Sequence, residues 1–222
     1  MNRFTARVSA LLGLLTVEIV GGVILFLAAF ALFFYLTRVV FVENSQALDQ
    51  WAFARMDDLH RALPATEGVA TAISFFASLW FLAPAGVIGP LLLRRAGQRR
   101  EAWELLLSLV GGILLNQLLK TYFQRPRPAN HLLHVYGLSF PSGHSMLAVA
   151  FYGCLAWLLT RHFGRPWWIL PLLLWAVLIG LTRIYLHAHY ATDVLAGFAG
   201  GAAWLVLLRA GMHLFWREQK TI

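Results

Sequence analysis

The chain has 222 residues, of which 59% are hydrophobic and only 13% are charged, and its mean hydropathy is +0.67. An ordinary soluble domain is about 45–50% apolar and about 25% charged, so this composition excludes a typical water-soluble protein and indicates a membrane protein. The formal net charge is +8. Because no basic run with interleaved aromatic residues lies outside the apolar stretches, we expect no nucleic acid partner.

Six apolar stretches predict membrane-spanning helices, each of which needs roughly 20 mostly apolar residues. In chain order they are Ile19–Thr37, Gly68–Leu93, Leu105–Leu119, Ser145–Thr160, Pro166–Thr182 and Val194–Leu208. The last four reach spanning length by including flanking residues that snorkel or face the bundle interior. We therefore predict an all-α, polytopic membrane protein with six transmembrane helices, forming one domain over residues 1–222. The first stretch is too long for the apolar region of a signal peptide, which indicates a retained helix.

The segment between the first two stretches, residues 43–66, fits two interpretations equally. It contains apolar residues near helical spacing, which are Leu48, Trp51, Ala52, Leu59 and Leu63. The first interpretation is an amphipathic helix on the outer leaflet, and the second is an ordinary polar loop with some helix. In the last stretch, Gly197 and Gly201 form a GxxxG pattern, which favours close helix packing.

The distribution of lysine and arginine predicts the orientation of the helices. If the N-terminus is cytoplasmic, eleven of the eighteen basic residues lie on the cytoplasmic side: Arg3, Arg7, Arg94, Arg95, Arg99, Arg100, Arg161, Arg165, Arg209, Arg217 and Lys220. The outer side then holds Arg38, Arg55, Arg61, Lys120, Arg125, Arg127 and Arg183, together with most of the acidic residues. We therefore expect both termini in the cytoplasm.

Charged residues gather at the outer ends of the third to sixth predicted helices. Lys120 ends the third helix, and the loop after it carries Arg127. The fifth helix ends with Arg183, and His189 and Asp193 follow four residues apart, a spacing that places them on one face of a helix. Ionisable groups near a membrane are costly, so they usually face the bundle interior and serve a function. This cluster would attract a polyanion.

The stretch PSGH, residues 141–144, predicts a seat for phosphate. Ser142 and Gly143 can begin the fourth helix, and a helix N-terminus offers free N–H groups and a partial positive charge to an anion. Gly143 allows the backbone to approach a ligand closely. His144 would then stand beside the bound phosphate, where it can transfer protons.

Four residues near these motifs have simpler interpretations. We expect Arg125 to anchor the chain among lipid headgroups and His187 to form a hydrogen bond in the membrane interface. We expect His131 and His134, in the loop before the PSGH stretch, to be solvated. The phosphate site is favoured by the joint occurrence of the motifs, because either a PSGH or an HxxxD pattern alone is weak.

Three motifs resemble those of the type 2 phosphatidic acid phosphatase family, the membrane lipid phosphatases related to vanadium haloperoxidases. The family motif KxxxxxxRP corresponds to KTYFQRPRP, residues 120–128, and PSGH corresponds to residues 141–144. The motif SRxxxxxHxxxD corresponds to TRIYLHAHYATD, residues 182–193, where Thr182 replaces the usual serine and keeps a hydroxyl. The six-helix layout resembles the family across nearly the whole chain.

The resemblance implies a lipid phosphatase that needs no metal and no cofactor. By this analogy His189 is a nucleophile that forms a phosphohistidine, Asp193 orients it, and His144 protonates the leaving group and later activates water. The residues implied to hold the phosphoryl oxygens are Lys120, Arg127, Ser142, Gly143 and Arg183.

The resemblance to bacterial members implies undecaprenyl diphosphate, phosphatidylglycerophosphate or phosphatidic acid as substrate, and an outward-facing site ranks undecaprenyl diphosphate first. The expected location is the bacterial cytoplasmic membrane, with the active site outside. Two alternatives are a phosphotransferase with a lipid or sugar acceptor and a non-catalytic lipid-binding or transport protein. The presence of His144, His189 and Asp193 argues against the non-catalytic alternative, and membrane spans argue against a haloperoxidase. The sequence does not indicate an oligomeric state.

Overall fold

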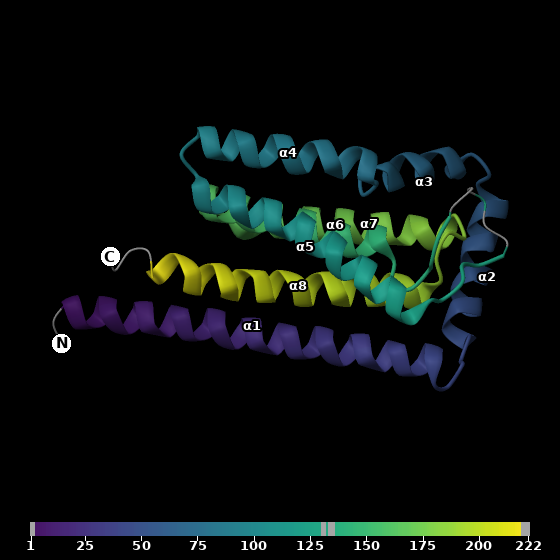
Figure 1. The fold of residues 1–222 in the computed structure, drawn as a ribbon, viewed down its shortest axis with the longest axis horizontal. Coiled ribbons are helices and arrows are strands. Elements are labelled where there is room, and N and C mark those ends of the chain that lie inside the picture. Colours follow the sequence, from purple (N-terminus) through teal and green to yellow (C-terminus); the bar gives the residue numbers. More distant parts are fainter. Residues whose placement is uncertain (1–2, 130–131, 133–135, 219–222) are drawn as a thin grey trace.

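The computed structural model describes residues 3–129, 132 and 136–218, and these residues form helices and parts of the connections between them. The helices are α1 (Arg3–Phe41), α2 (Ala47–Ala62), α3 (Thr66–Phe75), α4 (Leu79–Arg95), α5 (Arg99–Phe123), α6 (Gly143–Phe163), a 3-10 turn η1 (Pro166–Trp168), α7 (Ile169–Tyr185) and α8 (Ala191–Glu218). Figure 1 shows the long helices side by side, with α2 crossing one end of the bundle.

Within the described part of the chain, six helical segments are long and apolar enough to span a membrane, which confirms the predicted number. They are Ile19–Phe41, Thr66–Arg95, Arg99–Phe123, Gly143–Phe163, Pro166–Tyr185 and Ala191–Leu214. The second span consists of α3 and α4, which are separated at residues 76–78. There the Ser78 side chain accepts a hydrogen bond from the N–H of Phe81 at 3.4 Å and so caps α4.

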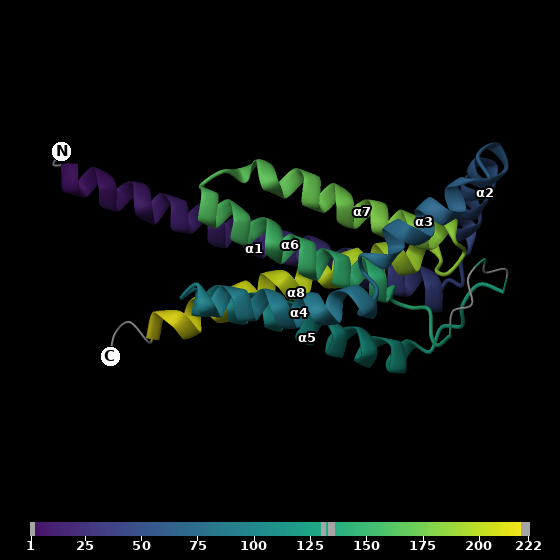
Figure 2. The ribbon, with the colours of Figure 1, turned by 90° about the horizontal axis from the view of Figure 1, so that it is seen from above.

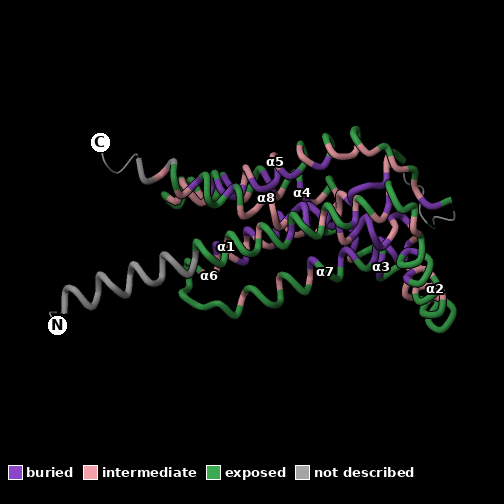
Figure 3. Tube along the Cα trace, turned by 90° about the horizontal axis from the view of Figure 1, so that it is seen from below, coloured by how far each residue is buried: buried purple, intermediate pink, exposed green. Residues whose placement is uncertain are grey.

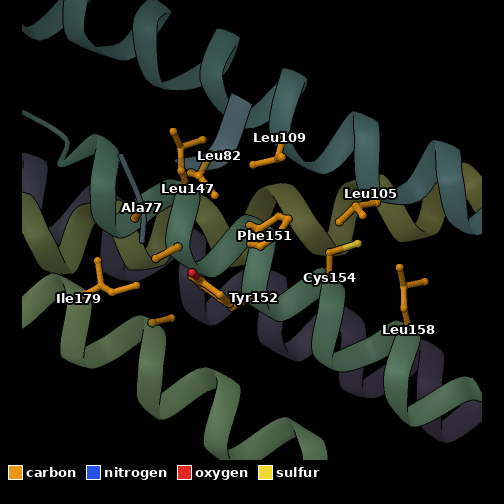
Figure 4. Close-up of a cluster of buried hydrophobic side chains, with 12 residues drawn as sticks. Ala77, Leu82, Leu105, Leu109, Leu147, Phe151, Tyr152, Cys154, Leu158 and Ile179 are labelled. Atoms are coloured by element: carbon orange, nitrogen blue, oxygen red, sulfur yellow. The ribbon is translucent and has the colours of Figure 1, made fainter. Parts of the chain in front are cut away.

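Helices α6 and α8 lie at the centre of the bundle. In the most apolar part of each of these two helices 56% of the residues are buried, against 11% in the first span. Figure 3 shows exposed residues along α1 and α7 and buried residues toward the middle of the bundle. The largest apolar core joins α6 to α4, α5 and α7, and it includes Leu82, Leu109, Phe151 and Ile179 (Figure 4). The outward-facing apolar side chains of α1 are suited to contact lipid.

The GxxxG pattern lets α8 pack closely against the start of α6. A methyl group on Gly197 would lie 2.6 Å from the carbonyl oxygen of Ser142, and one on Gly201 would lie 2.6 Å from that of Met146. Only glycine fits at such separations, so the predicted close packing is confirmed.

Helix α2 accounts for most of the segment 43–66. Its Ala52 packs against Ile184 and Val194, whereas Trp51 is 60% exposed and points away from the bundle core. The helical part of the prediction is therefore confirmed, and contact of α2 with a lipid leaflet stays a prediction.

We call the end of the bundle that carries α2 the motif end, because the loops after α5 and α7 also lie there (Figure 2). Helix α1 begins and α8 ends at the opposite end, which also carries the connections from α4 to α5 and from α6 to α7. The connections between the spanning helices thus lie at the two ends of the bundle, which correspond to the two faces of a membrane.

Candidate active site

The three sequence motifs meet at the motif end, around a cavity of about 450 Å³. Five predicted site residues line it: Lys120, Arg127, Gly143, His144 and His189. The rest of the wall includes the apolar residues Ala77, Leu79, Ile113, Leu138 and Leu147 and the polar residues Asn116, Gln117 and Tyr136. The other predicted site residues, Ser142, Arg183 and Asp193, are buried and contact this group from behind.

His189 lies in the short connection between α7 and α8, and its two ring nitrogens have different surroundings. The residue is 1% exposed, and its backbone N–H donates to the carbonyl of Arg183 at 3.2 Å. Nδ1 lies 3.5 Å from Oδ2 of Asp193 and 3.3 Å from Oγ of Ser139. Nε2 lies 3.2 Å from an N–H group of Arg127. These partners favour the tautomer with its proton on Nδ1 and its lone pair on Nε2.

The environment of His189 keeps its imidazole neutral. Burial lowers the pKa of His189 to about 3, the Asp193 carboxylate opposes this effect, and the charges of Arg127 and Arg183 reinforce it. A neutral imidazole with a free lone pair is the form that attacks an electrophile.

Asp193 is fully buried, and protein donors occupy both of its oxygens. Oδ2 accepts from the hydroxyl of Ser139 and, at 3.0 Å, from the backbone N–H of Tyr190. Oδ1 accepts from Arg125 at 2.6 Å. Ser139 was not among the predicted site residues, because the sequence marks it only by its place two residues before the PSGH motif.

The PSGH motif leads into α6, which begins at Gly143 with Ser142 as its N-cap, so the predicted helix start is confirmed and phosphate binding there stays a prediction. The Ser142 hydroxyl accepts from the N–H of Ser145 at 3.5 Å and from its hydroxyl at 3.0 Å, and the Ser142 N–H donates to the Asp193 carbonyl at 2.9 Å. The side-chain amide of Asn116 donates to the carbonyl of Pro141 at 3.3 Å and fixes the turn from α5. These contacts leave the first-turn N–H groups near Gly143 available to an anion.

Three basic residues surround this turn and are themselves fixed by the fold. Lys120 donates to the carbonyl of Leu138 at 2.5 Å, and Arg127 donates to that of Ala188 at 2.7 Å. Arg183 is 3% exposed and donates to the Ser74 hydroxyl at 2.6 Å. Its Nε has no hydrogen-bond partner among the described residues. Such fixed cations can stabilise negative charge without reorganising.

The structure contradicts one of the simpler interpretations. Arg125 is not a headgroup anchor, because its side chain is only 11% exposed and is bonded to Asp49 and Asp193. Sequence reasoning failed here because both carboxylates are distant along the chain. His187 lies 3.0 Å from Asp57 and stacks on Phe53, in agreement with a hydrogen-bonding role outside the cavity.

Two further predictions concern this site. His131 and His134 lie outside the described residues. Within the described part of the chain, no group of three or more histidine, cysteine, aspartate or glutamate side chains is placed to hold a metal ion.

Comparison with known proteins identifies the family. The chain is 39% identical to phosphatidylglycerophosphatase B of Bacillus subtilis (strain 168) over 120 residues, which cover 50% of this chain and 59% of that protein. It is 34% identical to lipid A 1-phosphatase of Rhizobium johnstonii over 145 residues, which cover 56% of each protein. The chain thus spans less than two thirds of the length of these relatives.

The fold has a solved counterpart, the crystal structure of a transmembrane PAP2-type phosphatidylglycerolphosphate phosphatase from Bacillus subtilis. The TM-score is 0.75 at 29% identity, and the match covers 84% of this chain and 94% of that one. The model of the PAP2 superfamily matches residues 101–217, which contain all three motifs. This chain, with its six spans and its motifs gathered at one end, therefore belongs to the PAP2 superfamily.

Proposed function

We propose that this chain is an integral membrane phosphatase that hydrolyses a lipid phosphomonoester or diphosphate. The observation that carries the proposal is the cavity at the motif end. His189 lines it together with Lys120, Arg127 and the start of α6, and Nε2 of His189 lies 3.2 Å from Arg127. Cations and a helix N-terminus suit phosphate, and the apolar part of the wall suits a lipid.

The first chemical step forms a phosphohistidine. The lone pair of His189 Nε2 attacks phosphorus, a P–N bond forms, and the bond from phosphorus to the leaving oxygen breaks. His144, which carries a proton when the phosphate anion is bound beside it, gives that proton to the leaving oxygen, and Asp193 stabilises the imidazolium that forms at His189. The guanidinium and ammonium groups and the N–H groups of α6 stabilise the charge on the equatorial oxygens.

The second step releases phosphate. His144, now neutral, takes a proton from water, and the water oxygen attacks phosphorus as the P–N bond breaks. The electron pair of that bond returns to His189 Nε2, so both histidines regain their starting states. No step requires a metal ion or a cofactor.

Phosphatidylglycerophosphate is the first candidate substrate, with undecaprenyl diphosphate and phosphatidic acid as the others. The names of the two Bacillus subtilis proteins support this order. Undecaprenyl diphosphate, which sequence reasoning ranked first, is supported by the surplus of cations around the cavity. The proposed location is the bacterial cytoplasmic membrane, with the motif end facing outward.

The test is release of inorganic phosphate from these three lipids by the purified protein in detergent with EDTA. We expect release without an acceptor and its loss in His189→Ala. Release only when an acceptor is added would indicate the phosphotransferase, and no release from any lipid would indicate the non-catalytic alternative. Activity that EDTA abolishes and Mg²⁺ restores would contradict the metal-free mechanism. Vanadate, which can adopt the five-coordinate geometry of phosphorus, should compete with the lipid.

A further inference from the structure

Arg125 bridges two buried carboxylates at the motif end. One guanidinium nitrogen donates to Asp193 at 2.6 Å and to the hydroxyl of Thr192 at 2.7 Å, and the other donates to Asp49 at 2.8 Å. The guanidinium also lies over the ring of Tyr190, 4.0 Å from its centroid. These three hydrogen bonds and the ring contact fix the group far more tightly than a surface ion pair would.

Asp49 ties α2 to the same place. The residue is 2% exposed, although it lies in the first turn of a helix whose other acidic side chains are far more exposed. Its oxygens accept from the backbone N–H of Thr192 at 2.9 Å and from the Thr192 hydroxyl at 3.0 Å. A carboxylate buried against the start of α8 costs free energy unless it is paired, and Arg125 and Thr192 provide the pairing.

We propose that Asp49 and Arg125 are positioning residues of the active site, which hold the Asp193 carboxylate in the orientation that His189 requires. Helix α2 is then part of the active-site framework, although the superfamily match begins at residue 101 and does not include it. This inference rests on the proposed function for its catalytic consequence.

The physical role follows from the two oxygens of Asp193. Oδ2 must face Nδ1 of His189, and the carboxylate can turn away unless Oδ1 is also held. Arg125 is the donor at Oδ1, and Asp49 holds Arg125 in place. Neither Asp49 nor Arg125 lines the cavity. Their removal should therefore lower kcat while KM stays close to that of the wild type.

Arg125 also balances the charge of Asp193. The charged groups that act on His189 are Asp193 on α8, Arg183 on α7 and Arg127 in the loop after α5. His144 on α6 and Lys120 on α5 line the same cavity as His189. Asp49 on α2 acts through Arg125. If Arg125 is replaced by glutamine, the negative charge of Asp193 is no longer offset, and the protonated form of His189 becomes more favourable.

The experiment measures both consequences in the full-length protein in detergent. Arg125→Gln should lower kcat on the order of 10–100-fold, by analogy with the loss measured when a group that orients a metal-binding histidine is removed. In the Asp193→Asn background the same change should cause no further loss, because Arg125 acts through Asp193. The matched control is Arg38→Gln, an arginine at the same end whose side chain is 71% exposed and pairs with Glu43.

The second readout is the titration of His189 by NMR of the ¹⁵N-histidine-labelled protein, with His189→Ala to assign the signal. Arg125→Gln should raise the pKa of His189, and Arg38→Gln should leave it unchanged. This titration needs no turnover, so it decides the positioning claim even if no lipid phosphate proves to be a substrate.

Three results would overturn the inference. The first is a pKa of His189 in Arg125→Gln equal to that of the wild type. The second is an unchanged kcat in Arg125→Gln. The third is a further fall of kcat when Arg125→Gln is added to Asp193→Asn, as large as the fall that it causes alone. If Arg125→Gln does not fold, Asp49→Asn is the second variant, with the exposed Asp58→Asn as its control. Asp49→Asn should lower kcat and not KM, and equal rates in the two variants would overturn the inference. A wild-type protein that releases no phosphate from any of the lipids would instead contradict the proposed function, and the titration of His189 would still test the inference.

Discussion

At the scale of single residues, the two histidines of the cavity have different surroundings. His189 is held through Nδ1 by Asp193 and Ser139, whereas its Nε2 lies beside Arg127 at the cavity and is the proposed attacking atom. His144 lies in the first turn of α6, beside the N–H groups expected to bind the phosphate. These surroundings support the proposal that His189 is the nucleophile and that His144 transfers the proton.

This assignment predicts that the two alanine variants differ in their dependence on the leaving group. His189→Ala should abolish both turnover and the trapped phosphoenzyme. His144→Ala should slow a lipid phosphomonoester on the order of 10²–10⁴-fold, because a poor alkoxide leaving group needs a proton. A diphosphate or an activated aryl phosphate should lose less. Rates for two leaving groups decide the matter, and equal losses in His144→Ala would contradict the assignment.

The low pKa of His189 predicts a pH dependence of stability. The pKa is lowered from 6.5 to about 3 in the folded protein, so between these values the unfolded chain binds a proton that the folded chain does not. The free energy of unfolding should therefore fall on acidification below the ordinary histidine pKa, by about 1.4 kcal/mol per pH unit.

The measurement is the melting temperature in detergent between neutral and acidic pH, for the wild type and for His189→Gln. The glutamine side chain does not titrate, so the unfolded variant gains no proton at position 189 and its melting temperature should fall less steeply as the pH falls. Other titrating groups are common to both proteins and cancel in the comparison. Parallel curves would show that His189 binds its proton equally in both states.

The sequence predicted the site residues that belong to the three motifs. It did not predict the residues outside the motif pattern that hold motif residues in place. Lys120, Arg127 and His189 were identified by spacing and lie in one cavity. Arg125 was misassigned because its partner Asp49 is 76 positions away, and no local pattern reports a contact of that length. Asn116 lies in an apolar helix, where its contact with the PSGH turn could not be read from the sequence.

At the scale of helices, the spans were predictable because their length and polarity are set by the bilayer. The break between α3 and α4 was not, because the apolar run from Gly68 to Leu93 continues through it. At this break the Ser78 side chain, in place of a backbone carbonyl, accepts the hydrogen bond from the N–H of Phe81 and caps α4. Composition alone does not reveal that a serine caps a helix in this way.

The contact of α8 with α6 predicts opposite effects of glycine-to-alanine changes along α8. Alanine at Gly197 or Gly201 would place a methyl group 2.6 Å from a backbone carbonyl of α6. We expect a loss of about 1–3 kcal/mol from overpacking, which outweighs the helix propensity gained. Gly211 has no atom within 4 Å of such a methyl group, so Gly211→Ala should be neutral or slightly stabilising.

Thermal unfolding in detergent measures these differences, and phosphate release adds a second contrast. Gly197 contacts Ser142 and lies one turn beyond Asp193, so Gly197→Ala should also lower the rate. Gly201→Ala should act mainly on stability. If Gly197→Ala were as stable as Gly211→Ala, the close contact of the two helices would be absent in the folded protein.

At the scale of the whole molecule, the basic residues at the two ends serve different purposes. At the motif end, hydrogen bonds and ion pairs within the protein hold four basic side chains at the site, namely Lys120, Arg125, Arg127 and Arg183. The other three basic residues there lie near acids, as Arg38 does with Glu43. The basic residues of the opposite end therefore remain the stronger determinants of orientation.

This distribution predicts that the motif end faces outward and that the opposite end is cytoplasmic. Cysteine variants test it, because the only native cysteine, Cys154, is buried. In a Cys154→Ala background, a membrane-impermeant thiol reagent applied to intact cells should label Arg55→Cys on α2. It should not label Arg95→Cys at the end of α4 until the cells are permeabilised. Both positions are exposed, so access differs only by side of the membrane. The reverse pattern would place the cavity in the cytoplasm, where it would meet lipid phosphates of the inner leaflet.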